Sequence, residues 1–288
     1  MRALVGVDEL SERMAGAERT VLLDVRWALG DPDGKRHYLQ GHLPGAVHVD
    51  LATELASPGG PETGRHPLPV PEDFAVAVRR WGVRDGDTVV AYDATGGLAA
   101  ARAWWLLRHA GVGDAYLLDG GLSAWTAAGL PLESGDVHPS AGDATTGWGH
   151  LPVVDTETAA RWPDRGILLD ARAGDRYRGD SEPVDPRAGH IPGALSAPTT
   201  GNLGADGRFL PADALRRRFA SLGAGPAAAE VAVYCGSGVT AAHQIAALAE
   251  AGIPAALYPG SWSQYQANPK RPAATGPEPR SRDRRRDV

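Results

Sequence analysis

The chain has 288 residues, enough for about two ordinary domains, and 43% of them are hydrophobic, which argues against a disordered chain. Its net charge of −6 argues against a nucleic-acid-binding protein. A single cysteine rules out an intramolecular disulfide, which fits a reducing compartment. The N-terminal stretch lacks the apolar core of a signal peptide, and no apolar run reaches the length of a membrane span. We therefore expect a cytoplasmic protein.

Short apolar segments alternate with helical ones along the first half of the chain. The predicted strands cover residues 21–25, 46–49, 89–92 and 115–118, and the predicted helices cover residues 71–81 and 99–110. Strand and helix in alternation predict an α/β fold with a mostly parallel sheet flanked by helices. A ligand of such a sheet sits beyond the carboxyl ends of its strands.

The second half repeats the first. Four motifs recur in the same order at offsets of about 140 to 148 residues: 22–26 as 168–172, 41–46 as 189–194, 89–93 as 231–235, and 118–121 as 258–261. The repeat predicts two tandem domains of similar fold.

Breaker-rich sequence marks the expected domain boundaries. We place the first domain at residues 1–133, a connector without periodicity at 134–152, the second domain at 153–271, and a tail at 272–288. The tail is rich first in proline and then in arginine. A solvated, disordered segment is the favoured interpretation, and a weak anionic partner is the alternative.

The sequence around Cys235 is the strongest chemical signal. An apolar strand ends at Cys235, and an alanine-rich helical pattern begins just past Thr240. Gly236 and Gly238 let the intervening loop turn its N–H groups toward one point, where the helix N-terminus adds a positive dipole end. A sulfur at this point is expected to be a nucleophilic thiolate held in an anion-binding loop. The alternative is a small buried hydrophobic residue, which would have no need of such a loop.

Position 93 in the first half corresponds to Cys235 and holds an aspartate. A carboxylate repels anions and cannot carry sulfur, so we expect the first domain to be non-catalytic. Arg176 and Arg187 follow a strand of the second half and could bind a carboxylate. On the residues alone, the alternative is that these arginines pair with the acidic side chains around them, Asp175, Asp180, Glu182 and Asp185.

The run Cys235-Gly-Ser-Gly-Val-Thr-Ala241, with Gly260-Ser-Trp-Ser263 downstream, resembles the active-site loop of two-domain rhodanese-type sulfurtransferases, above all the 3-mercaptopyruvate branch. The resemblance covers nearly the whole chain. It implies two rhodanese-like α/β domains, of which the second is catalytic. It also implies that the first, with Asp93 in place of the cysteine, is inactive.

The resemblance also implies roles for particular residues. Cys235 and Ser237 would be catalytic, His66 would lie near the active site, and Arg176 and Arg187 would bind the substrate carboxylate. The spacing of the two arginines is two residues longer than in the family, which leaves Arg172 and Arg178 as alternatives. The remaining residues of the active-site loop are Gly236, Gly238, Val239 and Thr240.

One position departs from the family pattern. The family's Val-Asp-Leu-Asp segment ends here in Ala52, so the proposed Ser-His-Asp relay of related enzymes lacks its aspartate. The histidines of the two Gly-His-x-Pro-Gly turns, His42 and His190, occur in both halves and are read as turn-stabilising. No Cys/His cluster suits a metal, and we expect neither a metal nor an organic cofactor.

The predicted function is sulfur transfer through a persulfide on Cys235. The thiosulfate-preferring branch has basic residues directly after the cysteine, whereas Gly236 and Ser237 are uncharged, which favours 3-mercaptopyruvate as donor. The expected acceptor is cyanide or a thiol, such as a thioredoxin-like protein or a small thiol, and the expected state is a monomer that binds neither nucleic acid nor membrane.

Three other functions compete with this prediction. The first is a thiosulfate sulfurtransferase, and the second is a non-enzymatic module that binds sulfane sulfur. The third is a cysteine phosphatase or arsenate reductase, whose loop carries an arginine six residues after the cysteine, where this chain has Ala241.

Overall fold

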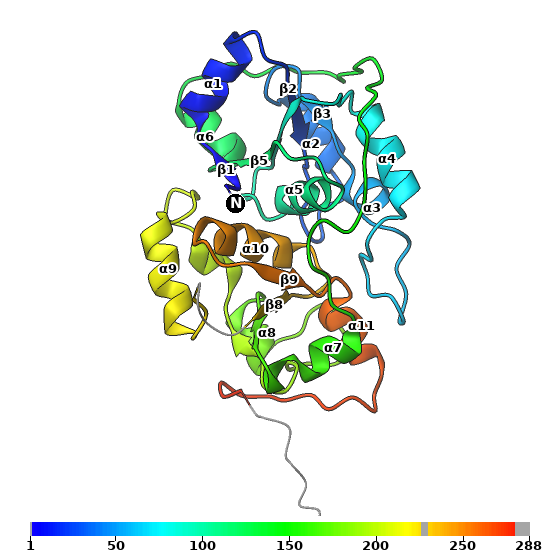
Figure 1. Ribbon diagram of the computed structural model, residues 1–288, viewed down its shortest axis with the longest axis vertical. Helices are drawn as coiled ribbons and strands as arrows, with labels where there is room; N and C mark the ends of the chain where they lie inside the picture. The colour runs from blue at the N-terminus through cyan, green and yellow to red at the C-terminus, as the bar shows by residue number, and fades with distance from the viewer. Residues whose placement is uncertain (1, 226–229, 280–288) are drawn as a thin grey trace, which may run out of the picture. The chain divides into compact units, whose positions relative to one another are not determined.

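A computed structural model describes residues 2–225 and 230–279. The chain divides into two compact units (Figure 1). Among the described residues, unit 1 comprises 2–58, 68–151 and 203–211, and unit 2 comprises 59–67, 152–202, 212–225 and 230–279. In the described part of the chain, no helix has both the length and the apolar character that crossing a membrane requires.

Unit 1 is a five-stranded parallel sheet in the order β1-β5-β4-β2-β3. The strands are β1 (Leu4–Val5), β2 (Thr20–Asp24), β3 (Val47–His48), β4 (Thr88–Tyr92) and β5 (Ala115–Leu118). The helices are α1 (Val7–Ala15), α2 (Gly34–Gln40), α3 (Leu51–Glu54), α4 (Pro71–Arg80), α5 (Ala100–His109) and α6 (Gly121–Ala127). Every strand and helix predicted in this half is present, and no end differs from its predicted position by more than one residue.

Unit 2 repeats the plan with a four-stranded parallel sheet in the order β7-β6-β8-β9. The strands are β6 (Ile167–Asp170), β7 (Leu195–Ser196), β8 (Val231–Tyr234) and β9 (Ala255–Leu257). The helices are α7 (Thr156–Arg161), α8 (Gly174–Arg178), α9 (Ala212–Ser221), α10 (Thr240–Glu250) and α11 (Ser261–Ala267), with short 3₁₀ turns at Trp162–Asp164 and Thr199–Asn202. The predicted fold class, two tandem α/β domains, is confirmed.

The central strands are buried on both faces, which explains why they read as continuous apolar runs. In β8, Ala232 and Tyr234 pack into a core with residues of α7 and α11. Val231 and Val233 alternate with them and are equally buried, toward the face that α10 covers. Cys235 directly follows the carboxyl end of this buried strand, at the side of the sheet where all the parallel strands end.

The two Gly-His-x-Pro-Gly turns have the same structure in both units. His42 and His190 are fully buried, and each ring stacks on a tyrosine, Tyr38 at 4.1 Å and Tyr177 at 3.7 Å between ring centres. The Nδ1 atom of each histidine lies within hydrogen-bond distance of the carbonyl oxygen of the same tyrosine. The repeated histidines therefore stabilise the two turns, as the sequence predicts.

Unit boundaries differ from the predicted ones in two segments. Residues 59–67, from the first half of the sequence, group with unit 2, and residues 203–211, from the second half, group with unit 1. The expected connector, residues 134–152, is mostly part of unit 1, where Gly142 donates to the carbonyl of Arg79 and Gly147 to that of Ala110.

The structured chain also extends past the expected end of the second domain at residue 271. His190 and Ala274 exchange two backbone hydrogen bonds of 2.9 Å, and Ala274 is buried. Part of the segment assigned to the tail is thus held by unit 2. The arginine-rich part of that predicted tail, residues 280–288, lies outside the described residues.

Candidate active site

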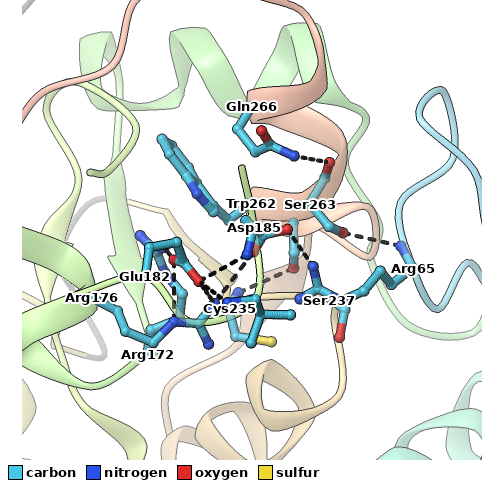
Figure 2. A network of polar contacts seen from close by, with 12 residues as sticks. Arg65, Arg172, Arg176, Glu182, Asp185, Cys235, Ser237, Trp262, Ser263 and Gln266 are labelled. Carbon is cyan, nitrogen blue, oxygen red and sulfur yellow. Dashed lines mark hydrogen bonds and ion pairs between the residues drawn. The ribbon is translucent and has the colours of Figure 1, made fainter. Parts of the chain in front are cut away.

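Cys235 lies between the end of β8 and the first turn of α10, as the sequence predicted, and only 2% of its surface is exposed (Figure 2). Its Sγ accepts a hydrogen bond of 3.1 Å from the backbone N–H of Gly238. Gly238 has φ of +79°, and a Cβ there would lie 2.4 Å from the carbonyl oxygen of Pro259. Only glycine can take this conformation in this space, so Gly238 allows its amide to face the sulfur.

A second segment, residues 261–263, holds the loop in place. The backbone N–H of Cys235 donates to Ser261 Oγ at 3.1 Å. The amides of Trp262 and Ser263 donate to the carbonyl oxygens of Cys235 and Gly236. Ser261 is fully buried and has φ of +53°, a conformation that non-glycine residues rarely adopt. The Gly-Ser-Trp-Ser motif therefore stabilises the loop that bears the cysteine.

Ser237 and His66 meet, although 171 residues separate them in the sequence. His66 Nδ1 lies 2.8 Å from Ser237 Oγ, and Ser237 is 8% exposed. The pair can pass a proton between a reacting group and the imidazole. Ala52 lies in α3 of unit 1, where the carboxylate of Asp50 caps the helix by accepting from the backbone N–H of Ala52 and Thr53.

Arg176 reaches the active-site loop. The side chain extends from α8, and its Nε and Nη2 donate to Glu182, at 3.2 and 2.6 Å. A Cβ built on Gly236 would lie 3.4 Å from Arg176 Nη1. The sequence predicts Arg176 close to the strand that bears the cysteine, and in the structure its side chain lies beside the loop that follows.

Arg187, the expected partner of Arg176, contributes none of the three atoms nearest to a Cβ built on Gly236, although it lines the same cavity as Arg65. Arg187 Nη1 donates to the backbone carbonyl of Arg271 at 2.7 Å, and Arg187 lines a cavity of about 1000 Å³ in unit 2. The nearest atom to the position beside Gly236 belongs instead to Arg65, whose Nη2 lies 3.2 Å away. Nothing in the sequence marks Arg65 except its place directly before His66.

The two alternative arginines have other roles. Arg172 is buried, forms a bidentate ion pair with Asp170, and lies 4.8 Å from the ring centre of Trp262. Although burial disfavours the charged guanidinium, the carboxylate of Asp170 raises the pKa of Arg172 above its ordinary value. Arg178 forms an exposed ion pair with Asp180. Neither arginine contributes an atom among those nearest to a Cβ built on Gly236.

The rest of the active-site loop leads into α10. Val239 is 3% exposed, and Thr240 is the first residue of the helix and partly exposed. The loop amides and the N-terminus of this eleven-residue helix together favour an anion at the position of the sulfur. Across residues 2–225 and 230–279, no group of three or more His, Cys, Asp or Glu side chains is arranged to hold a metal ion.

The equivalent loop of unit 1 binds its own carboxylate. Asp93 is fully buried, and its two oxygens accept from four backbone N–H groups at 2.7–2.9 Å, those of Thr95, Gly97, Ala99 and Ala100. A loop of this kind is therefore an anion site, and in unit 1 an internal anion fills it. This geometry agrees with the expectation that unit 1 does not carry sulfur.

Comparisons with known proteins match both halves of the chain. The model of the rhodanese-like domain matches residues 6–128 and 155–268. A Pseudomonas aeruginosa protein named "Probable 3-mercaptopyruvate sulfurtransferase" is 48% identical over 95% of this chain and 98% of its own length. A Mycobacterium tuberculosis protein with the provisional name of a thiosulfate sulfurtransferase is 45% identical over 96% of this chain and 98% of its own.

A solved structure is also similar over the same range. The crystal structure of SseA from Escherichia coli, described as a 3-mercaptopyruvate sulfotransferase, has a TM-score of 0.80 at 35% identity. The match covers 91% of this chain and 99% of that one.

Proposed function

Because this chain belongs to the family of proteins built from rhodanese-like domains, we propose that it transfers sulfane sulfur from 3-mercaptopyruvate to a thiol or cyanide through a persulfide on Cys235. The observation that carries the proposal is the position of Cys235 Sγ. The Sγ atom accepts a hydrogen bond from the amide of Gly238. The next residue in the chain, Gly236, lies beside the side chains of Arg65 and Arg176. A nucleophilic sulfur, donors for an anion and cations for a carboxylate are thus adjacent.

The first half-reaction forms the persulfide. The thiolate of Cys235 attacks the sulfur of 3-mercaptopyruvate, a sulfur–sulfur bond forms, and the carbon–sulfur bond of the donor breaks. The carbon keeps the electron pair as the enolate of pyruvate, which then takes up a proton. Ser237 and His66 form a hydrogen-bonded pair that can deliver this proton. Arg176 would bind the donor carboxylate.

The second half-reaction releases the sulfur. An acceptor thiolate attacks the outer sulfur of the persulfide, the bond between the two sulfurs breaks, and the electron pair returns to Cys235. Cyanide reacts in the same way and leaves as thiocyanate. Backbone amides of the loop stabilise the negative outer sulfur, as four such amides stabilise the carboxylate of Asp93 in the equivalent loop.

Thiosulfate is the second candidate donor, because the Mycobacterium tuberculosis relative is named for it. In that reaction sulfite is the leaving group, and the sulfur–sulfur bond of the donor breaks. We favour 3-mercaptopyruvate because Gly236 and Ser237 add no positive charge next to the cysteine. A phosphatase loop is disfavoured because Ala241 stands six residues after Cys235, where those enzymes place an arginine.

The acceptor and the setting of the reaction also belong to the proposal. With one cysteine in the chain, the second thiol must come from another molecule, and a thioredoxin-like protein or a small thiol supplies that chemistry. We place the enzyme in the cytoplasm as a monomer, on its composition and its single thiol.

The experiment that tests the function follows the mass of the intact protein. Wild-type protein treated with 3-mercaptopyruvate should gain one sulfur and lose it again on addition of a thiol or cyanide. The Cys235→Ser variant should gain none, because no other side chain can form the persulfide.

Multiple turnovers, faster with 3-mercaptopyruvate than with thiosulfate, are expected in steady-state kinetics. Sulfur on the serine variant would refute the assignment of Cys235. A single loading without turnover would instead identify a sulfur-binding module, and faster turnover with thiosulfate would establish the second donor.

A further inference from the structure

Two guanidinium groups approach the residue next to the nucleophile. A Cβ built on Gly236 would lie 3.2 Å from Arg65 Nη2 and 3.4 Å from Arg176 Nη1. In the view of Figure 2, Arg176 and Arg65 reach the Cys235 loop from opposite sides. Because Gly236 has no side chain, the position between the two groups is not filled by the loop itself.

The nitrogen atoms nearest to Gly236 have unused donors. Arg176 uses Nε and Nη2 to bind Glu182 and Asp185, and Arg65 uses Nη1 to bind Asp185. Within the described ranges, Arg65 Nη2 and Arg176 Nη1 have no hydrogen-bond partner, and neither does the buried Nε of Arg65. A guanidinium has five N–H groups, so each arginine can bind an internal carboxylate and a ligand together.

Internal carboxylates hold both guanidinium groups in place. The side chains of Glu182 and Asp185 are 3% and 2% exposed, and Asp185 binds Arg65 through one oxygen and Arg176 through the other. The negative charges of Glu182 and Asp185 offset the positive charges of Arg65 and Arg176. The attraction for a ligand therefore comes from directed N–H groups rather than from excess positive charge. Directed donors of this kind select a planar carboxylate.

We propose that Arg65, together with Arg176, binds the carboxylate of the sulfur donor and thereby determines specificity for an α-oxo acid. This inference rests on the proposed function for the identity of the donor. In 3-mercaptopyruvate two carbons separate the sulfur from the carboxylate carbon, which suits a carboxylate beside Gly236 when the sulfur faces Cys235. Arg65 takes the role expected of Arg187, which contributes none of the three atoms nearest to a Cβ built on Gly236.

Alkylation of Cys235 tests carboxylate binding without sulfur chemistry. Iodoacetate and iodoacetamide both form a carbon–sulfur bond with release of iodide, but only iodoacetate carries a carboxylate. Since the chain has one cysteine, the mass of the intact protein reports the reaction at Cys235 alone. The quantity measured is the ratio of the iodoacetate rate to the iodoacetamide rate, compared with the same ratio for a free small thiol.

We expect the wild-type ratio to exceed that of the free thiol, and Arg65→Gln to lower the wild-type ratio by about tenfold or more, the scale of losing a charge-assisted pair. Arg187→Gln should lower it by less than about twofold. Arg216→Gln, which removes an exposed arginine paired with Asp213 on α9, is the matched control and should leave it unchanged. A misplaced loop would change both alkylation rates together and leave the ratio intact.

The outcomes separate this inference from the proposed function. An unchanged ratio in Arg65→Gln, or an equal loss in Arg187→Gln, would overturn the role of Arg65. If the ratio behaves as expected and wild-type protein fails to take sulfur from 3-mercaptopyruvate, the carboxylate site stands and the proposed donor is wrong. If wild type takes sulfur from this donor and Arg65→Gln does so with an unchanged kcat/KM, the donor stands and the inference fails.

Discussion

Asp93 and Cys235 show how one side chain decides what an anion-binding loop does. In unit 1 the loop amides donate to a carboxylate that is part of the chain, and in unit 2 the amide of Gly238 donates to a sulfur that can react. The backbone design is shared, and the residue at the end of the strand sets the chemistry. The carboxylate in unit 1 therefore has a structural role.

This role predicts a loss of stability when Asp93 is neutralised. In Asp93→Asn, one carboxylate oxygen becomes an NH₂ group that faces backbone N–H donors, and the remaining amides lose a charged acceptor. We expect the free energy of unfolding to fall by about 2–3 kcal/mol. Chemical denaturation measures it, with Asp180→Asn as an exposed control. A change below about 0.5 kcal/mol, the size of an ordinary surface substitution, would show that the four bonds contribute little.

At the scale of elements, the loop between β8 and α10 contains two glycines, and different constraints act on the two positions. Gly238 has a positive φ and touches the carbonyl of Pro259, so its constraint is internal to the fold. Gly236 has no such strain, and what a Cβ would meet there is the far end of two arginine side chains. The first glycine shapes the loop, and the second, on our proposal, leaves room for the donor carboxylate.

Alanine at each glycine should separate the two roles. Gly238→Ala should lower the thermal midpoint and prevent loading of Cys235, because its Cβ would lie 2.4 Å from a backbone oxygen. Gly236→Ala should leave the midpoint nearly unchanged and reduce kcat/KM for 3-mercaptopyruvate by about tenfold, since the methyl group occupies the space beside the guanidinium groups. Thermal unfolding and donor kinetics on both variants provide the check. Full activity in Gly236→Ala would argue against a carboxylate at that position.

At the scale of the whole molecule, the units do not coincide with the halves of the sequence. Residues 59–67 belong to unit 2 although they precede its other segments by more than eighty residues, and they carry Arg65 and His66. The backbone N–H of Arg65 donates to Ser263 Oγ, within the segment that also holds the Cys235 loop. Unit 2, which holds the proposed active site, therefore includes a part of the first half of the chain.

A fragment that starts at residue 134 tests this dependence. It retains Cys235, Ser237 and Arg176 but lacks residues 59–67, so we expect its ratio of iodoacetate to iodoacetamide alkylation to match that of Arg65→Gln. Sulfur transfer should fall further than in that variant, because His66 is also missing. Circular dichroism establishes whether the fragment is folded. A folded fragment with the activity of the full chain would show that the segment is dispensable.

Local patterns in the sequence determined much of this protein. Buried β-branched runs, alternating helical segments and an internal repeat predicted two α/β domains, since strand and helix periodicities are local properties. The strand–loop–helix pattern identified the cysteine, because glycines next to a helix start describe an anion-binding loop wherever they occur. Ser237, His66 and Arg176 were named as candidates by resemblance, and the structure brings them to the loop.

Only the tertiary structure brings Arg65 and Arg176 together beside Gly236. Arg65 and Asp185 are 120 residues apart in sequence, and their contact depends on where residues 59–67 pack. Resemblance to the Arg-aromatic…Pro-Arg arrangement of the family pointed to Arg187, whose Nη1 donates to the carbonyl of Arg271. Spacing along a loop does not determine where side chains point, because loop conformation is set by long-range packing and hydrogen bonds that the local sequence does not encode.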